Sequence, residues 1–173
     1  MDNIPDTPVF ANDRGGMGLE LESRGALLRP LMNLSERKTF KQLESVCKEW
    51  GARVFSMVRV ADVITIDAPV LSAGLKSFGL MAHFDFVVCN KDTMPVFAVE
   101  FDGPCHAKPE QMVRDRKKDA LCDICGLPLL RINSRYLSEP GTGMTVLTWL
   151  VGAWFLEHSF YQAQVEGFVA LDE

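Results

Sequence analysis

The spacing of apolar residues predicts one helix and then three strands in the first part of the chain. From Ser35 to Trp50 apolar residues recur at intervals of three and four, the repeat of an amphipathic helix. Three short runs rich in β-branched and aromatic residues follow, and they predict strands over residues 53–60, 82–90 and 95–101. Residues 61–80 fit neither repeat, and we expect a loop there with a short helix around residues 70–77.

The rest of the chain predicts two further helices separated by a strand. Pro109 to Cys125 has the composition of a helix, and Gly126 is a natural left-handed cap at its end. Residues 127–132 form a short apolar run that predicts a strand, and a last helix is expected from Met144 to about Gln162. The predicted order is therefore α-β-β-β-α-β-α, a mixed α/β layer with helices packed on a sheet.

Length and composition indicate one globular domain. A chain of 173 residues can bury a full hydrophobic core, and we expect a single domain over residues 31–173. Residues 1–30 are rich in Asp, Asn, Pro and Gly and are expected to form a loosely ordered arm. The net charge of −5 does not favour nucleic-acid binding by bulk charge, so any such binding must come from a local patch.

Cysteine content and hydropathy set expectations about location. An odd number of cysteines, five, and no visible secretory signal favour a reducing compartment, and the cytoplasm is the expected location. The longest apolar stretch, residues 144–156, falls short of the roughly 20 residues that a membrane-spanning helix needs, so no membrane association is expected. We expect that stretch to be core, or to be the surface of a homodimer or of a complex with a protein partner.

Three carboxylates lie on two of the predicted strands, in otherwise apolar surroundings. Residues i and i+2 of a strand share a face, so Glu100 and Asp102 project together, with Asp85 beside them on the neighbouring strand. An ionised carboxylate in such a place needs compensation, and Mg²⁺ or Mn²⁺ accepts carboxylates and a backbone carbonyl, here that of Phe101, as hard oxygen ligands. The pattern predicts a metal-dependent active site. The alternative is a cluster of salt bridges with nearby Lys and Arg side chains.

The segment that follows adds basic and titratable side chains. His106 can serve as a general base, a metal ligand or a phosphate contact. Gln111, Arg114 and Lys118 lie at i, i+3 and i+7, and we expect them on one helix face. Five Lys or Arg residues against two Asp or Glu residues between positions 108 and 118 can hold phosphates despite the acidic whole. The alternative is an ordinary solvated helix surface.

Several motifs recur in an order that resembles a known superfamily. They are Ser35-Glu36, Phe84-Asp85-Phe86, Glu100-Phe101-Asp102-Gly103, His106, Gln111, Arg114-Asp115, Lys118-Asp119 and Gly126-Leu127-Pro128-Leu129-Leu130-Arg131. Over about residues 30–135 the chain resembles a family of bacterial domains of unknown function in the PD-(D/E)XK, or restriction-endonuclease-like, superfamily, similar to the very-short-patch repair endonucleases. The resemblance implies an α-β-β-β-α-β core with a mixed sheet flanked by helices, and Mg²⁺-dependent hydrolysis of phosphodiester bonds, with DNA as the expected substrate.

The resemblance also implies roles for single residues. Asp85 and Glu100 become metal ligands, and Glu36 becomes a further acidic residue of the active site. The superfamily motif usually ends Glu-x-Lys, but Asp102 stands where that lysine is expected. We expect Lys118 to supply the missing positive charge, with Arg114 or His106 next in order.

The remaining roles follow from that assignment. Asp102 or His106 would position or deprotonate the attacking water. Lys118 and Arg114, with Gln111, would contact the substrate phosphate. Two alternatives stay open. One is a catalytically inactive module of the same fold that binds nucleic acid or a protein partner. The other, weaker one is a zinc-stabilised adaptor that uses the cysteines.

Overall fold

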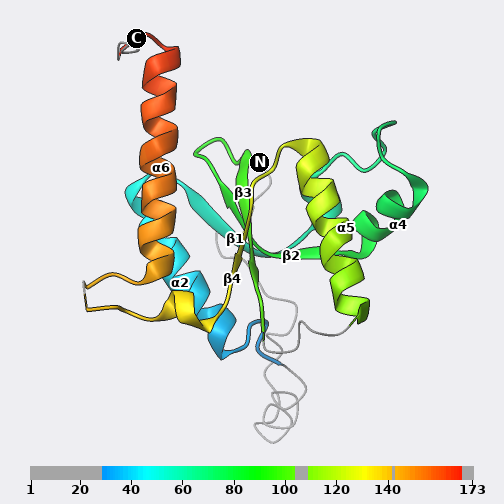
Figure 1. The fold of residues 1–173 in the computed structure, drawn as a ribbon, viewed down its shortest axis with the longest axis horizontal. Helices are drawn as coiled ribbons and strands as arrows, with labels where there is room; N and C mark the ends of the chain where they lie inside the picture. The colour runs from blue at the N-terminus through cyan, green and yellow to red at the C-terminus, as the bar shows by residue number, and fades with distance from the viewer. Residues whose placement is uncertain (1–28, 104–108, 142, 169–173) are drawn as a thin grey trace, which may run out of the picture. The chain divides into compact units, whose positions relative to one another are not determined.

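A computed structural model divides the chain into two compact units, residues 1–31 and 32–173. The structure describes residues 29–103, 109–141 and 143–168. The arm expected at residues 1–30 therefore lies almost entirely outside the described residues. The second unit contains a sheet with helices on both of its faces (Figure 1).

A four-stranded sheet of mixed direction forms the centre of the second unit. Its strands are β1 (Arg53–Arg59), β2 (His83–Cys89), β3 (Pro95–Phe101) and β4 (Leu129–Ile132), in the spatial order β1-β2-β3-β4. β1, β2 and β3 pair antiparallel, whereas β3 and β4 pair in parallel. A parallel pair needs a long crossover, and α5 (Pro109–Cys125) supplies it. The prediction of a mixed sheet flanked by helices is confirmed.

The helices follow the predicted order, with two corrections. The other helical elements are α2 (Leu34–Glu49), α3 (Val60–Val63), α4 (Ala73–Met81), the 3-10 helix η1 (Ser134–Leu137) and α6 (Val146–Val165). Residues 61–80 were expected to hold one short helix at 70–77, but α3 and α4 occupy the two ends of that segment. The last helix begins a few residues later than expected, because Thr145 caps it by accepting the N–H of Thr148, and it also ends a few residues later.

The start of α2 is fixed by a reciprocal pair of caps. The side-chain oxygen of Asn33 accepts the backbone N–H groups of Ser35 and Glu36 at 2.9 and 3.0 Å. In return Glu36 Oε2 accepts the backbone N–H of Asn33 at 2.8 Å, which completes a capping box. At the other end Gly51 adopts a φ of +66°, a conformation that favours glycine.

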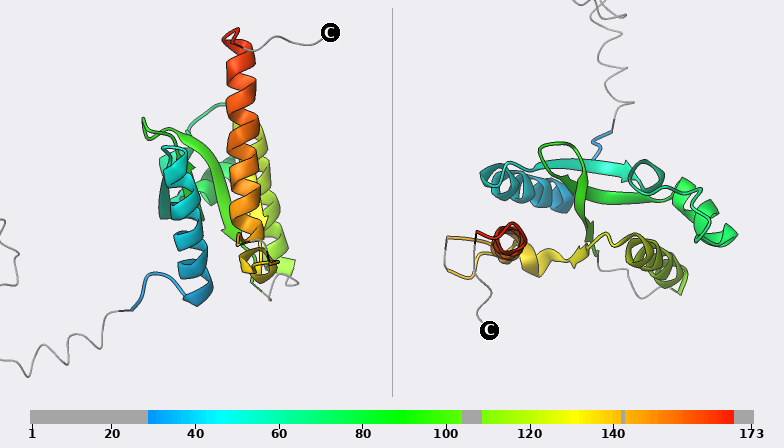
Figure 2. Two further views of the ribbon diagram at one scale, coloured as in Figure 1. Left: turned by 90° about the vertical axis from the view of Figure 1, so that its left-hand side faces the viewer. Right: turned by 90° about the horizontal axis from the view of Figure 1, so that it is seen from above.

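Each face of the sheet has its own core, beneath the helices that Figure 2 shows on the two sides of the sheet. One cluster joins α2 and α6 to the sheet, and its buried members include Leu43, Phe86, Val99, Leu147 and Val151. The other lies under α3, α4 and α5, and its members include Val60, Val87, Ala98, Leu121 and Cys122. Strand side chains alternate between faces, so Asp85 and Glu100 share the α5 face with Val87 and Ala98, two residues away on each strand. Helix α5 therefore covers both candidate carboxylates.

No helix within the described residues is long and apolar enough to cross a membrane.

Candidate active site

The two central carboxylates lie where the regular pairing of β2 with β3 ends. The last register pair at this end is Phe86 with Val99. Beyond it the strands are connected through side chains, because Asp85 Oδ2 accepts the backbone N–H of Phe101 at 2.8 Å and Glu100 Oε1 accepts that of Asp85 at 3.4 Å. Each carboxylate thus reaches across to the other strand, and the two acids are neighbours as expected.

Lys118 of α5 completes this group. Its Nζ lies 2.6 Å from Glu100 Oε2 and donates to the carbonyl of His83 at 2.8 Å. The ammonium also lies 5.6 Å from the centre of the Phe84 ring, within reach of a cation–π interaction. Lys118 and Glu100 are 9% and 8% exposed, so both charges are buried. The ammonium of Lys118, on the helix that follows the Glu100-Phe101-Asp102 motif, therefore forms an ion pair with Glu100 of that motif.

The pKa of Glu100 reflects opposing effects of burial and of the two charged neighbours, Lys118 and Asp85. Burial raises the pKa of this carboxyl, the Lys118 ammonium lowers it, and the nearby Asp85 carboxylate raises it. The net result is a pKa above the ordinary value of 4.5. Burial of the carboxyl therefore outweighs the attraction of the Lys118 ammonium, and a further cation at this point would favour the ionised form of Glu100.

Asp102 has a different partner from the other two acids. Arg131 of β4 lies opposite Glu100 in the parallel register, and its Nη1 is 3.6 Å from Asp102 Oδ1. The same guanidinium contacts α5, with Nη2 2.7 Å from Asp119 Oδ1 and Nη1 3.5 Å from Asp115 Oδ1. These contacts flank Lys118 along the helix. Arg131 thus links the end of β3 to the turn of α5 that carries Lys118.

An open cleft of about 590 Å³ adjoins Asp102. Its lining comes from the end of β3, the start of α2 and the segment after β4: Ser35, Phe101, Asp102, Gly103, Asn133, Ser134 and Arg135. Arg135 is exposed. The cleft gives solvent and small polar groups access to this end of the sheet.

The other predicted site residues fall in several places. Glu36 is engaged in the capping box of α2 and contacts Asn33, not Asp85 or Glu100. Gln111 donates to Asp115 Oδ1 at 2.9 Å. Arg114 is exposed whereas Lys118 is buried, so the face expected to unite them is split between solvent and sheet. His106 lies outside the described residues.

The donors of the central group fit a hard divalent cation. Within the described residues no three His, Cys, Asp or Glu side chains gather into a metal-binding group. Mg²⁺, however, usually takes only one or two carboxylates and keeps several waters. Asp85 uses Oδ2 for the Phe101 N–H, which leaves Oδ1 for another ligand. Asp85 and Glu100, with the Phe101 carbonyl, would therefore suit Mg²⁺ or Mn²⁺.

The sequence placed Arg131 in a motif without assigning it a role, and it did not point to Arg135. The signal for Arg131 is its place opposite Glu100, which becomes visible only once β3 and β4 are known to pair in parallel. For Arg135 the sequence offers no more than a basic residue after a short strand.

Neither a curated protein nor a solved structure matches this chain. One family does match, over residues 28–142, about two thirds of the 173 residues, and its description is "Protein of unknown function (DUF2726)". The matched part includes Asp85, Glu100, Lys118 and Arg131 and ends before α6. The chain therefore belongs to the DUF2726 family.

Proposed function

We propose that the protein is a metal-dependent nuclease of the PD-(D/E)XK type that hydrolyses phosphodiester bonds in DNA. The observation that carries this proposal is the group formed by Asp85, Glu100 and Lys118. Two carboxylates from adjacent strands and one ammonium from the following helix meet at a strand end, with Lys118 Nζ 2.6 Å from Glu100 Oε2. The sequence motif lacks its usual lysine, and Lys118 brings the same charge to the same glutamate from another element.

Each residue has a role that its contacts allow. Asp85, Glu100 and the Phe101 carbonyl would hold Mg²⁺ or Mn²⁺. Such an ion, when bound, polarises a phosphate oxygen and lowers the pKa of a water molecule. Lys118 places a fixed positive charge beside Glu100, where it stabilises negative charge developing on a phosphate. Asp102, which lines the cleft, or His106 would accept the proton of the attacking water.

The substrate phosphates would be held by exposed cations around this group. Arg114 on α5 and Arg135 in the lining of the cleft are both exposed. Gln111 lies on α5 one turn before Asp115, to which it donates a hydrogen bond. With a net charge of −5 on the whole chain, DNA contact would be limited to this local group. A cytoplasmic protein is part of the same proposal, and the unpaired cysteines at positions 47, 89, 122 and 125 agree with a reducing compartment.

Asp85→Asn is the sharpest test. The amide oxygen of Asn can still accept the Phe101 N–H, so the variant removes the charge and keeps the strand contact. We expect cleavage of single-stranded, duplex or branched DNA with Mg²⁺ or Mn²⁺ to fall about 100-fold or more. Asp92→Asn, in the turn between β2 and β3, is the matched control and should cleave like the wild type. Equal cleavage by both variants, or no cleavage by the wild type on any substrate, contradicts the proposal.

A second candidate is an inactive module of the same fold that binds nucleic acid or a protein partner. The observation in its favour is that the acids already have partners inside the protein, Lys118 for Glu100 and the Phe101 N–H for Asp85. Calorimetric titration with Mn²⁺ separates the two candidates. Binding that Asp85→Asn abolishes supports the nuclease, whereas the absence of any such binding favours the inactive module.

A further inference from the structure

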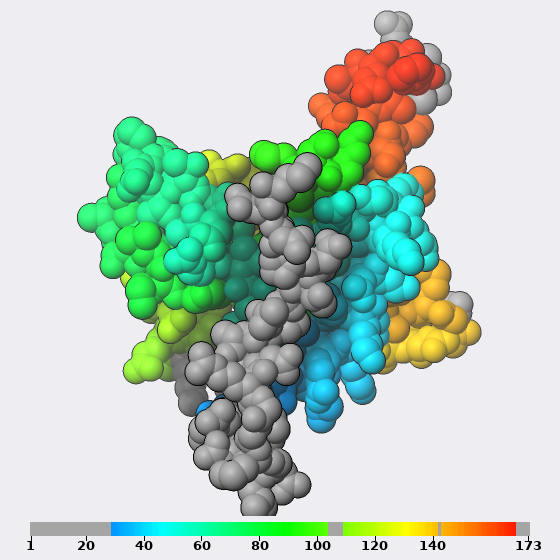
Figure 3. Space-filling model, turned by 180° about the vertical axis from the view of Figure 1, so that it is seen from behind, coloured from blue at the N-terminus to red at the C-terminus, as the bar shows by residue number. Residues whose placement is uncertain are grey.

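A row of apolar residues runs along the side of α6 that faces away from the sheet. The buried residues Leu147, Val151 and Phe155 attach this helix to the core. On the opposite side the exposed large residues are Trp149, Leu156 and Phe160, which are 61%, 63% and 54% exposed. In Figures 1 and 3 the outer end of α6, drawn in red, extends past the neighbouring strands and helices. The α6 helix therefore presents an apolar surface that the described residues of this chain do not cover.

Residues on this side of α6, four of them exposed and Ala163 half-buried, follow the repeat of a coiled-coil seam. Trp149, Ala153, Leu156, Phe160 and Ala163, here called the outer stripe, are spaced by four, three, four and three residues. This spacing averages 3.5, which keeps a stripe in contact with a second helix along its length. Exposed apolar residues that bind no partner are not expected to keep that spacing. The outer stripe is therefore suited to pairing with a helix.

The charges on α6 narrow the choice of partner. Its 20 residues include no Lys or Arg, and its only acidic residue is Glu157. A nucleic acid would need cations on this surface, and so would the interfacial helix of a membrane-bound protein. A helix partner selected by charge would need a complementary row of charges, which is missing here. A second copy is compatible with this surface, because all but one of the net negative charges of the chain lie outside α6.

The sizes of the side chains also fit a second copy. From the N-terminal end the outer stripe reads Trp, Ala, Leu, Phe, Ala, and from the C-terminal end it reads Ala, Phe, Leu, Ala, Trp. The reversed order therefore has a small residue at each place where the forward order has a large aromatic one. In an antiparallel pair centred on Leu156, Trp149 lies at the level of Ala163 of the second copy, and Ala153 lies within one residue of the level of its Phe160. Large side chains then meet small ones, as close packing of two helices requires.

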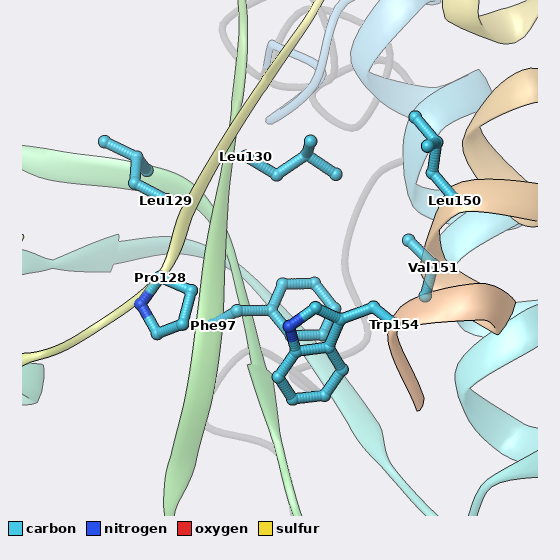
Figure 4. Close-up of a pocket in the computed structure, with 7 residues that line it drawn as sticks. All are labelled: Phe97, Pro128, Leu129, Leu130, Leu150, Val151 and Trp154. Carbon is cyan, nitrogen blue, oxygen red and sulfur yellow. The ribbon is translucent and has the colours of Figure 1, made fainter. Parts of the chain in front are cut away.

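We propose that two copies of this chain associate through the outer stripe as an antiparallel helix pair. Trp149, Leu156 and Phe160 expose roughly 400 Å² together, about half of the ~800 Å² per partner of a stable interface. An apolar groove of about 270 Å³ lies on another side of α6, where Leu150, Val151 and Trp154 face Phe97 and Pro128 (Figure 4), so it adds nothing to this contact. The expected state is a monomer–dimer equilibrium with a dissociation constant in the micromolar range. This proposal does not depend on nuclease activity.

The full chain tests it by sedimentation equilibrium between about 10 and 500 µM. Leu156→Asp places a charge in the centre of the stripe and should weaken dimerisation about 100-fold. Tyr161→Asp is the matched control, because Tyr161 is also 61% exposed but lies off the stripe. It should dimerise like the wild type. A wild type that stays monomeric at 500 µM, or two variants that behave alike, overturns the proposal.

Cross-linking tests the same surface without adding charge. Under mild oxidation Leu156→Cys should form a disulfide-linked dimer faster than Tyr161→Cys, because the two copies of residue 156 meet at the symmetry axis. A mixture of Trp149→Cys and Ala163→Cys proteins should cross-link faster than either protein alone. Equal rates in the first comparison refute the outer stripe as the interface, and equal rates in the second refute the antiparallel arrangement.

Discussion

Replacing Lys118 with methionine should be among the most damaging single changes in this domain. Methionine keeps most of the length and apolar volume of lysine but removes the ammonium. That ammonium lies 2.6 Å from Glu100 Oε2 and donates to the carbonyl of His83 at 2.8 Å. The side chains of Lys118 and Glu100 are 11% and 10% exposed, so solvent screens the pair only weakly. The variant therefore leaves Glu100 buried beside Asp85 without its counter-charge.

The expected loss of unfolding free energy is about 3–5 kcal/mol at neutral pH, the cost of removing one partner of a buried ion pair. A surface pair of the same chemistry would cost under about 1 kcal/mol. A small domain has a total stability of roughly 5–15 kcal/mol. Lys118→Met is therefore expected to lower the urea midpoint by a large fraction, and in a marginal domain it would prevent folding.

The loss should depend on pH. Burial, more than the repulsion from Asp85, raises the pKa of Glu100, and Lys118 opposes that rise. Without Lys118 the native pKa rises further above the ordinary value of 4.5. The folded state then holds its proton to a higher pH than the unfolded chain does, so stability falls as the pH rises between the two values. The destabilisation should be small near pH 4 and larger at pH 8.

Urea unfolding of Lys118→Met at both pH values measures this effect. Lys117→Met is the matched control, since Lys117 is a neighbour on α5 whose ammonium lies 5.8 Å from the Phe78 ring instead of beside an acid. The double variant Lys118→Met with Glu100→Gln should regain at least about 2 kcal/mol, because no buried charge is then left unpaired. A loss below about 1 kcal/mol at pH 8, or no recovery in the double variant, would refute the reasoning.

Three further predictions concern other parts of the domain. Gly126→Ala should lower the unfolding free energy by about 1 kcal/mol, because Gly126 has a φ of +66°. Gly74→Ala, in the first turn of α4 with open space around it, should raise it by about 0.5 kcal/mol, and thermal melts compare the two variants. Burial raises the pKa of the Cys47 thiol to about 12, so iodoacetamide at pH 8 should modify the exposed Cys125 before Cys47, and Cys47 only on unfolding, as mass spectrometry can follow. Arg131→Gln should cost about 1.5 kcal/mol in urea unfolding, because the contacts of its guanidinium with α5 are lost.

Local patterns were sufficient for most of the fold. β3 and α5 have the predicted bounds, Pro95–Phe101 and Pro109–Cys125, because each has a strong signal at both of its ends. Residues 61–80 were harder, because α3 is only four residues long and has no side-chain cap. Such a helix is stabilised by its surroundings, here the burial of Val60 against α4 and β1. Its own four residues therefore give only a weak helix signal in the sequence.

The sequence alone determined which residues could form a site, since alternation along two strands places Asp85 and Glu100 on one face and composition marks α5 as the next helix. It could not determine which cation meets Glu100, because contact between α5 and the sheet depends on how the helix rotates and packs over residues far away in the chain. The tertiary structure decided that Lys118 turns inward and Arg114 outward. It also decided that Asp102 pairs with Arg131, because the parallel register of β3 with β4 sets that neighbour. Pairwise contacts of this kind arise only when separate elements close around a common core.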